Sequence, residues 1–135
     1  MSILGRRISN KTVAVIVLAM VVGAGGLIPL LSKTPSREIT LVARGMAFYL
    51  QDDPMTPNPT LVLQAGTTVR VVLHNLERGM THDLAMPAFR GASIEGLDWN
   101  ESGELTLRVP DRPGTYEYVC RPHSLMMHGT VRVIR

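Results

Sequence analysis

Side chains that bind soft metals gather near the C-terminus of this 135-residue chain. The stretch YEYVCRPHSLMMHG, residues 116–129, holds the only cysteine, two of the four histidines and two of the eight methionines. Thiolate, thioether and imidazole together are the ligand set that selects copper, with zinc as its generic competitor. A chain with one cysteine cannot form an internal disulfide, so metal ligation is a role that would account for the single thiol.

A histidine from an earlier part of the chain is expected beside Cys120 and His123. His82 lies in RGMTHDLAMP, just after the predicted strand 68–75, and Cys120 ends the predicted strand 115–120. If both strands end at one pole of a β domain, His82 meets Cys120 and His123 there. Two imidazoles, one thiolate and a nearby methionine form the trigonal set with a weak axial thioether that is typical of blue-copper electron-transfer sites. Structural zinc sites instead favour cysteine-rich tetrahedral sets.

The elements that must position these residues are strands. Runs rich in Val, Thr, Tyr and Leu, separated by Gly and Pro turns, indicate an all-β sandwich or barrel. They lie at 38–50 (with a break at Gly45), 61–66, 68–75, 104–111, 115–120 and 130–135, and a short strand is expected at 84–86. Alternation places Tyr116, Tyr118 and Cys120 on the inward face, as it does Val69, Val71 and Leu73, and Leu105, Leu107 and Val109. No strong helix signal occurs in this part of the chain, although the segment 91–103 could hold one helical turn.

The N-terminal part of the chain predicts a membrane segment. Residues 12–31 carry no charged side chain and are numerous enough to cross a hydrocarbon core. Residues 1–11 are basic, which predicts a cytoplasmic N-terminus with the remainder outside. A signal peptide cleaved after the small residues 22–24 is the alternative. We therefore expect a linker at 32–37 and an exported domain at 38–135, periplasmic or extracellular, which is anchored to the cytoplasmic membrane unless the signal is cleaved.

The distribution of charge argues against nucleic acid as a partner. The sequence pI is about 9.5, a value that usually suggests nucleic-acid binding. Five of the 14 basic residues precede residue 38, however, whereas all 11 acidic residues follow it. The predicted domain therefore has a net charge of −2, and the basic excess flanks the apolar segment.

Three stretches of the domain resemble the cupredoxins, the small blue copper proteins of plastocyanin and amicyanin type. They are HN…MTHDLAMP, PDRPGTYEYVCRPH and MHGTVRV, and the resemblance spans roughly residues 38–135. It implies a Greek-key β-sandwich with one copper ion per chain that carries single electrons. It also implies His82, Cys120 and His123 as the equatorial ligands and Met127 as the axial one.

The chain departs from the family pattern in two places. The loop from Cys120 to Met127 is one residue longer than in amicyanin-like members and one shorter than in plastocyanin-like ones, so Met126 remains an alternative axial ligand. Met127 is preferred because it keeps Met-x-Gly in register with the next strand. The family also has a neutral polar link between the two ligand loops, where this chain has Asp83 and Arg121. We expect these opposed charges to replace that link as an ion pair.

The resemblance implies an electron carrier rather than an enzyme, with transient redox partners that dock near His123. Pro87, Phe89 and Leu125 are predicted to form an apolar docking patch around it. Four histidines are too few for an oxygen-reducing multicopper centre, and the absence of a second cysteine argues against the binuclear centre of oxidase subunits. A copper chaperone is the alternative, supported by Met126, Met127 and His128, and a structural subunit with a vestigial site is a third reading. His74 and His128 are expected to be peripheral.

Overall fold

The computed structural model describes residue 35 and residues 37–135. The predicted segments 1–11 and 12–31, and most of 32–37, lie outside the described residues. Nothing helical in the described part is long and apolar enough to cross a membrane. The described residues form nine strands and one short 3-10 turn, Arg121–His123. The strands are β1 (Arg37–Arg44), β2 (Ala47–Leu50), β3 (Leu61–Gln64), β4 (Thr68–Asn75), β5 (His82–Met86), β6 (Ala92–Leu97), β7 (Ser102–Arg108), β8 (Gly114–Val119) and β9 (His128–Ile134).

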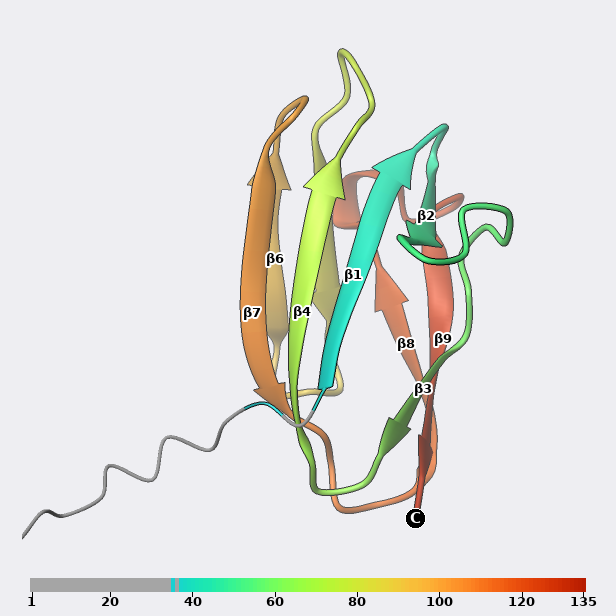
Figure 1. The fold of residues 1–135 in the computed structure, drawn as a ribbon, viewed down its shortest axis with the longest axis vertical. Coiled ribbons are helices and arrows are strands. Elements are labelled where there is room, and N and C mark those ends of the chain that lie inside the picture. Colours follow the sequence, from blue (N-terminus) through green and yellow to red (C-terminus); the bar gives the residue numbers. More distant parts are fainter. Residues whose placement is uncertain (1–34, 36) are drawn as a thin grey trace, which may run out of the picture. The chain divides into compact units, whose positions relative to one another are not determined.

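The strands form two sheets that pack face to face as a β-sandwich (Figure 1), which confirms the predicted fold class. One sheet has the order β2-β1-β4-β7 and the other β3-β9-β8-β5-β6. Most neighbours are antiparallel, but β1 pairs with β4 and β3 pairs with β9 in parallel. Parallel neighbours cannot be joined by a hairpin, so the chain crosses between the sheets and binds them into one unit.

Most predicted strands are confirmed with small shifts at their ends. The break predicted at Gly45 is a two-residue hairpin turn in which Gly45 (φ 53°) and Met46 (φ 58°) both have positive φ. A type I′ hairpin turn requires such angles because its twist matches that of the flanking strands. The prediction that the segment 91–103 could hold a helical turn was wrong. Residues 92–97 form β6, which pairs antiparallel with β5 and so extends the sheet beyond the strand that carries His82.

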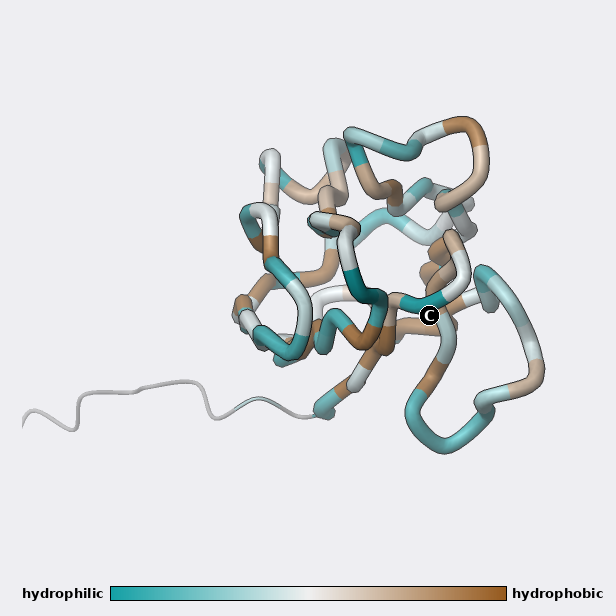
Figure 2. Tube along the Cα trace, turned by 90° about the horizontal axis from the view of Figure 1, so that it is seen from above, coloured by the Kyte–Doolittle hydropathy of each residue, from teal (hydrophilic) through white to brown (hydrophobic). Residues whose placement is uncertain are grey.

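The core confirms the predicted inward faces. Val69, Val71 and Leu73 are buried, as are Leu107 and Val109, whereas Leu105 is only partly buried. Seen from above, hydrophobic and hydrophilic residues are interspersed over the tube (Figure 2). Along β4, partly buried and buried residues alternate from Thr68 to Asn75. Alternation of this kind directs one face of each sheet to the core and the other to solvent.

Several chain segments meet at the end of the sandwich where β4 and β8 finish and β5 begins. Asn75, the last residue of β4, is fully buried there. Its side-chain amide donates to the carbonyls of Met80 (2.7 Å) and Leu97 (2.8 Å). Its backbone N–H donates to the Glu101 carbonyl at 2.9 Å. Asn75 therefore ties the loop after β4 to the end of β6, and this loop leads directly into His82.

Candidate metal centre

The three predicted equatorial ligands lie together at this end of the sandwich. His82 is the first residue of β5, Cys120 follows the last residue of β8, and His123 ends the 3-10 turn. The strands place His82 and Cys120 in the buried region, where both side chains are 0% exposed, while His123 is partly exposed. The turn is held by the N–H of His123, which donates to the Cys120 carbonyl at 3.1 Å.

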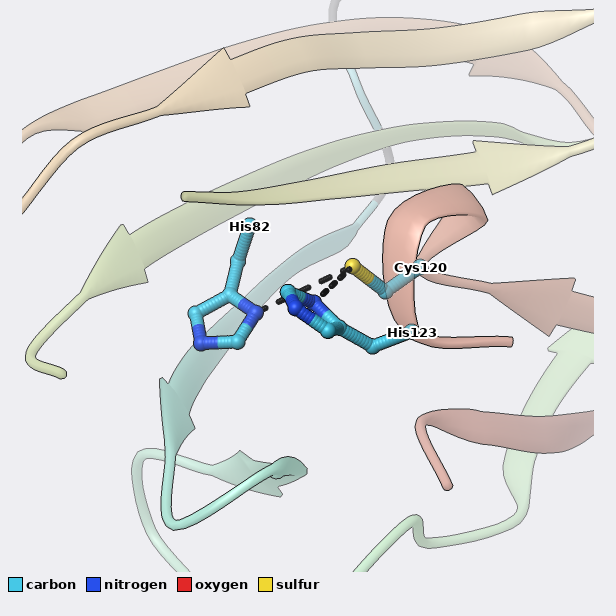
Figure 3. A group of neighbouring side chains, drawn as sticks. All are labelled: His82, Cys120 and His123. Atoms are coloured by element: carbon cyan, nitrogen blue, oxygen red, sulfur yellow. Dashed lines mark hydrogen bonds between the residues drawn. The ribbon is translucent and has the colours of Figure 1, made fainter. Parts of the chain in front are cut away.

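The ligand atoms are close enough to share one metal ion. Cys120 Sγ lies 3.8 Å from His82 Nδ1 and 3.5 Å from His123 Nδ1 (Figure 3), and all three atoms lie within 4.8 Å of one another. A metal ion with bonds of about 2.0–2.3 Å to nitrogen and sulfur spans separations of this size. The two imidazole rings are tilted by 59° with centroids 4.9 Å apart, and their Nδ1 atoms converge on the sulfur. The residues therefore fit a single mononuclear centre.

Met127 and Met126 differ sharply in their surroundings. Met127 is fully buried in the cluster that contains Cys120, whereas the Met126 side chain is 57% exposed. The Met127 backbone is fixed as well, because its carbonyl accepts from the Cys120 N–H and its N–H donates to the His123 carbonyl, each at 2.9 Å. The loop thus brings Met127 to the site and turns Met126 toward solvent.

Replacement of each methionine should separate their roles. Met127→Leu should raise the reduction potential, because loss of the thioether donor disfavours Cu(II). A change of about tenfold in the redox equilibrium would appear as about 59 mV in protein-film voltammetry. Met126→Leu is the matched control and should leave the potential unchanged. A shift in Met126→Leu with none in Met127→Leu would assign the axial position to Met126.

The thiol of Cys120 is shielded from water, which favours its neutral form. Burial raises the pKa of the Cys120 thiol above its ordinary value, and the backbone N–H groups of Asp83 and His123 oppose that effect only in part. A thiolate is the form that binds a metal, so metal binding must displace the proton.

Asp83 and Arg121 join the two ligand loops. Asp83 is buried, and its Oδ2 accepts from Arg121 Nε at 2.6 Å while its Oδ1 accepts from the Arg121 backbone N–H at 2.7 Å. Arg121 also reaches Glu95 at 3.1 Å. One of the two bonds to Asp83 thus comes from the backbone, so half of the link does not depend on the residue type at position 121.

Because Arg121 donates to Asp83 from both its backbone and its side chain, substitution of Asp83 should destabilise the protein more than substitution of Arg121. Asp83→Ala should lower the free energy of unfolding of the metal-free protein by about 2–3 kcal/mol, because it removes a buried carboxylate that accepts both the backbone N–H and the side chain of Arg121. Arg121→Ala should cost only a small part of that, since the backbone bond survives and the lost ion pair is half exposed. A charge swap at the two positions should not restore stability. Urea denaturation measures the free energy of unfolding of each variant. Equal decreases for Asp83→Ala and Arg121→Ala would contradict this prediction.

Sequence reasoning missed two polar residues that contact this region. Glu77 lies five residues before His82, and its Oε2 is 2.9 Å from His82 Nε2. Asn58 has a left-handed backbone (φ 47°), and its Nδ2 donates to the Met126 carbonyl at 2.9 Å. Its Oδ1 accepts from the Phe48 N–H at 3.0 Å, which ties the ligand loop to β2. The sequence carries no spacing signal for Asn58, whereas an acidic residue shortly before a candidate ligand histidine is a signal that could have been used.

Some residues proposed from the sequence lie away from the centre. Phe89 is only 4% exposed and packs against Tyr116, at the end of the sandwich opposite to His82. Phe89 and Pro87 follow the far end of β5, so their placement in a patch around His123 was wrong. Leu125 follows the 3-10 turn and is 94% exposed. His74 contacts Ser102, and His128 is exposed near Glu117, so neither belongs to the cluster of ligands.

Comparison with known proteins agrees with this geometry. Residues 51–134, more than half of the chain, match the family of copper binding proteins described as the plastocyanin/azurin family. Auracyanin B has a similar structure, with a TM-score of 0.61 and 26% identity over 76% of this chain and 91% of that one. Rusticyanin from Thiobacillus ferrooxidans has a TM-score of 0.59 at 20% identity, with 75% of this chain and 79% of that one covered. No curated protein sequence matches the chain.

Copper enzymes also contain a domain of this fold. The copper-containing nitrite reductase from Thermus scotoductus has a TM-score of 0.55 at 25% identity, over 72% of this chain but only 27% of that one. The fold and the convergent ligands define a small protein with one copper site, formed by His82, Cys120, His123 and Met127. The chain belongs to the plastocyanin/azurin family of copper-binding proteins, the cupredoxins.

Proposed function

We propose that this protein carries single electrons through a mononuclear type 1 copper site. The observation that carries the proposal is the graded exposure of the ligands: Cys120 and His82 are fully buried, whereas His123 reaches the surface. Copper, when bound, supplies the one-electron Cu(I)/Cu(II) couple. An electron that enters or leaves through the His123 ring edge crosses little protein, while the buried thiolate stays shielded from solvent oxidants.

Each ligand has a distinct role in this proposal. With copper bound, the Cys120 thiolate would be the strong covalent donor, and His82 and His123 would supply two imidazole nitrogens. Met127 would supply a weak thioether donor that adjusts the potential. The donors are held by strand ends and by backbone hydrogen bonds around the turn, so they move little between oxidation states.

A copper chaperone is the second candidate, and the 57% exposure of Met126 beside the ligand loop is the observation that favours it. The complete burial of Cys120 and His82 favours a carrier, because a chaperone must present its metal to an acceptor. Copper transfer separates the two. The loaded protein, mixed with an excess of a Cu(I) chelator, should retain its copper over hours as an electron carrier and lose it rapidly as a chaperone.

Redox partners are proposed to dock at the copper end of the sandwich. Large apolar side chains are exposed on the loops there: Leu76 (52%), Met80 (40%), Trp99 (46%), Leu125 (94%) and Met126 (57%). An apolar surface of modest size suits weak and transient redox encounters. This set replaces the patch predicted with Pro87 and Phe89, and only Leu125 is common to both.

Substitution of the most exposed residue tests the docking surface. Leu125→Asp should slow bimolecular electron exchange with the partner by about tenfold, because it places a charge in an apolar contact. Stopped-flow kinetics measure the rate. Ile134→Asp is a matched control, since Ile134 is exposed at 44% at the other end of the sandwich. Equal rates for both variants and the wild type would contradict docking at this end.

We also propose that the domain works outside the cytoplasmic membrane. The support is the uncharged segment 12–31 and the basic residues before it. Membrane fractionation and protease access in intact spheroplasts test the location, and the mass of the mature protein tells an anchor from a cleaved signal.

A further inference from the structure

His82 uses both ring nitrogens. Its Nδ1 faces Cys120 Sγ, and its Nε2 lies 2.9 Å from Glu77 Oε2. Binding of a metal at Nδ1 requires that nitrogen to be unprotonated, so the ring proton is on Nε2 and is donated to the carboxylate. The contact is shielded from water, because the His82 side chain is 0% exposed and that of Glu77 is 18% exposed.

Glu77 is itself held in place from two other directions. The same Oε2 accepts from the Met46 N–H at 2.9 Å, in the β1–β2 turn. The Glu77 backbone N–H donates to Asn75 Oδ1 at 2.9 Å. The carboxylate is therefore fixed before any metal binds, by the hairpin on one side and by the buried Asn75 on the other.

Within the part of the chain that the structure describes, no lysine or arginine side chain pairs with the charge of Glu77. Asp83, the other acidic residue beside a ligand, is paired with Arg121. The neighbouring Arg78 instead stacks on Trp99 at 4.1 Å. The Glu77 carboxylate is hydrogen-bonded to a ligand ring, so its negative charge lies close to the metal position. Solvent and salt screen such a short and shielded interaction only weakly.

We propose that Glu77 is a positioning residue of the copper site, whose carboxylate selects the His82 nitrogen that faces the metal and favours Cu(II) over Cu(I). A hydrogen bond to the far ring nitrogen fixes the tautomer and makes the ligand more basic, and a nearby negative charge stabilises the more positive oxidation state. The reduction potential is therefore lower than it would be with a neutral acceptor. This inference rests on the proposed one-electron function.

The first test separates charge from geometry. Glu77→Gln keeps a side-chain oxygen that can accept from both His82 and Met46 but removes the charge. It should shift the redox equilibrium toward Cu(I) by about tenfold, which is a rise of about 59 mV in the potential. Glu101→Gln is the matched control, because Glu101 lies in a neighbouring loop and accepts from the Asp98 N–H at 2.8 Å without contact to a ligand. A shift in Glu77→Gln no larger than that of the control would overturn the charge effect.

The second test needs no copper. In the metal-free wild type, 15N NMR should show the proton of His82 on Nε2, and Glu77→Gln should preserve this tautomer. Glu77→Ala removes the acceptor and should give a mixture of both tautomers in a folded protein. A single Nε2-H tautomer in Glu77→Ala would overturn the positioning role. A wild-type protein with no reversible copper couple would instead count against the proposed function, so the two failures are distinguishable.

Discussion

Replacement of Cys120 with serine should abolish the intense visible absorption that is expected of the copper-loaded protein. Such a band arises from charge transfer between a thiolate and Cu(II), and Cys120 is the only cysteine in the chain. Serine occupies nearly the same volume, so the fully buried position should remain packed. Copper affinity should fall by more than the roughly 10–100-fold that is typical of losing a residue that only supports a ligand. Absorption spectroscopy and competition with a chelator measure both effects.

The pH dependence of copper binding provides a check on the same thiol. Burial raises the pKa of Cys120, so the metal-free protein holds the proton at neutral pH and releases it when the metal binds. Copper affinity should therefore increase with pH, by about tenfold per unit between about pH 7.5 and 8.5, and Cys120→Ser should lose this dependence. A variant that retains the visible band or the pH slope would show that another donor binds the metal.

Replacement of Gly129 with alanine should destabilise the metal-free protein by about 3 kcal/mol, because overpacking a rigid core costs this much when the neighbour cannot move. Gly129 pairs with Tyr118 across β8 and β9, and a Cβ at Gly129 would lie 2.3 Å from the tyrosine ring. The ring is immobilised, since Tyr118 is fully buried, packs on Phe48 at 5.5 Å and donates its hydroxyl to the Pro59 carbonyl at 2.6 Å. Urea denaturation measures the loss.

Gly114 offers a matched control in the same strand pair. Gly114 pairs with Val133, and a Cβ there would meet the Tyr116 ring at 3.6 Å, which is ordinary contact. Gly114→Ala should be neutral or slightly stabilising, because it only restricts the unfolded chain. The loss in Gly129→Ala should also shrink when Tyr118 is replaced by leucine. Similar stabilities for both alanine variants would refute the steric role of Tyr118.

The clash at Gly129 explains part of what the sequence could predict. The Met-x-Gly pattern is visible in the chain, and the structure gives it a cause: only glycine fits beneath the Tyr118 ring at the start of β9. The inward faces of β4 and β8 were predictable because side chains alternate in a strand. The proximity of His82 and Cys120 was predictable because both residues lie at strand ends. The strands of a sandwich end at only two places, the two ends of the sandwich.

Contacts that depend on loop conformation were not predictable from the sequence. Asn58 reaches the ligand loop from 68 residues away through a left-handed backbone, and nothing in the local pattern specifies that approach. Phe89 is a different case, because it was placed near His123 by its apolar character alone. The strand predicted at 84–86 already separates Phe89 from His82, and β5 carries it to the opposite end of the sandwich. Strand β6 was missed because Glu95 and Gly96 weaken its alternating pattern, and pairing with β5 decides its conformation.

The visible absorption and EPR spectra of the purified protein, loaded with one equivalent of Cu(II), test the central claim most directly. A buried thiolate and two imidazoles around one copper predict an intense charge-transfer band with 1:1 stoichiometry. The band should disappear on reduction with ascorbate and return on reoxidation, without loss of copper. A weak and broad d–d spectrum, or copper that passes freely to a chelator on reduction, would contradict an electron carrier at this site.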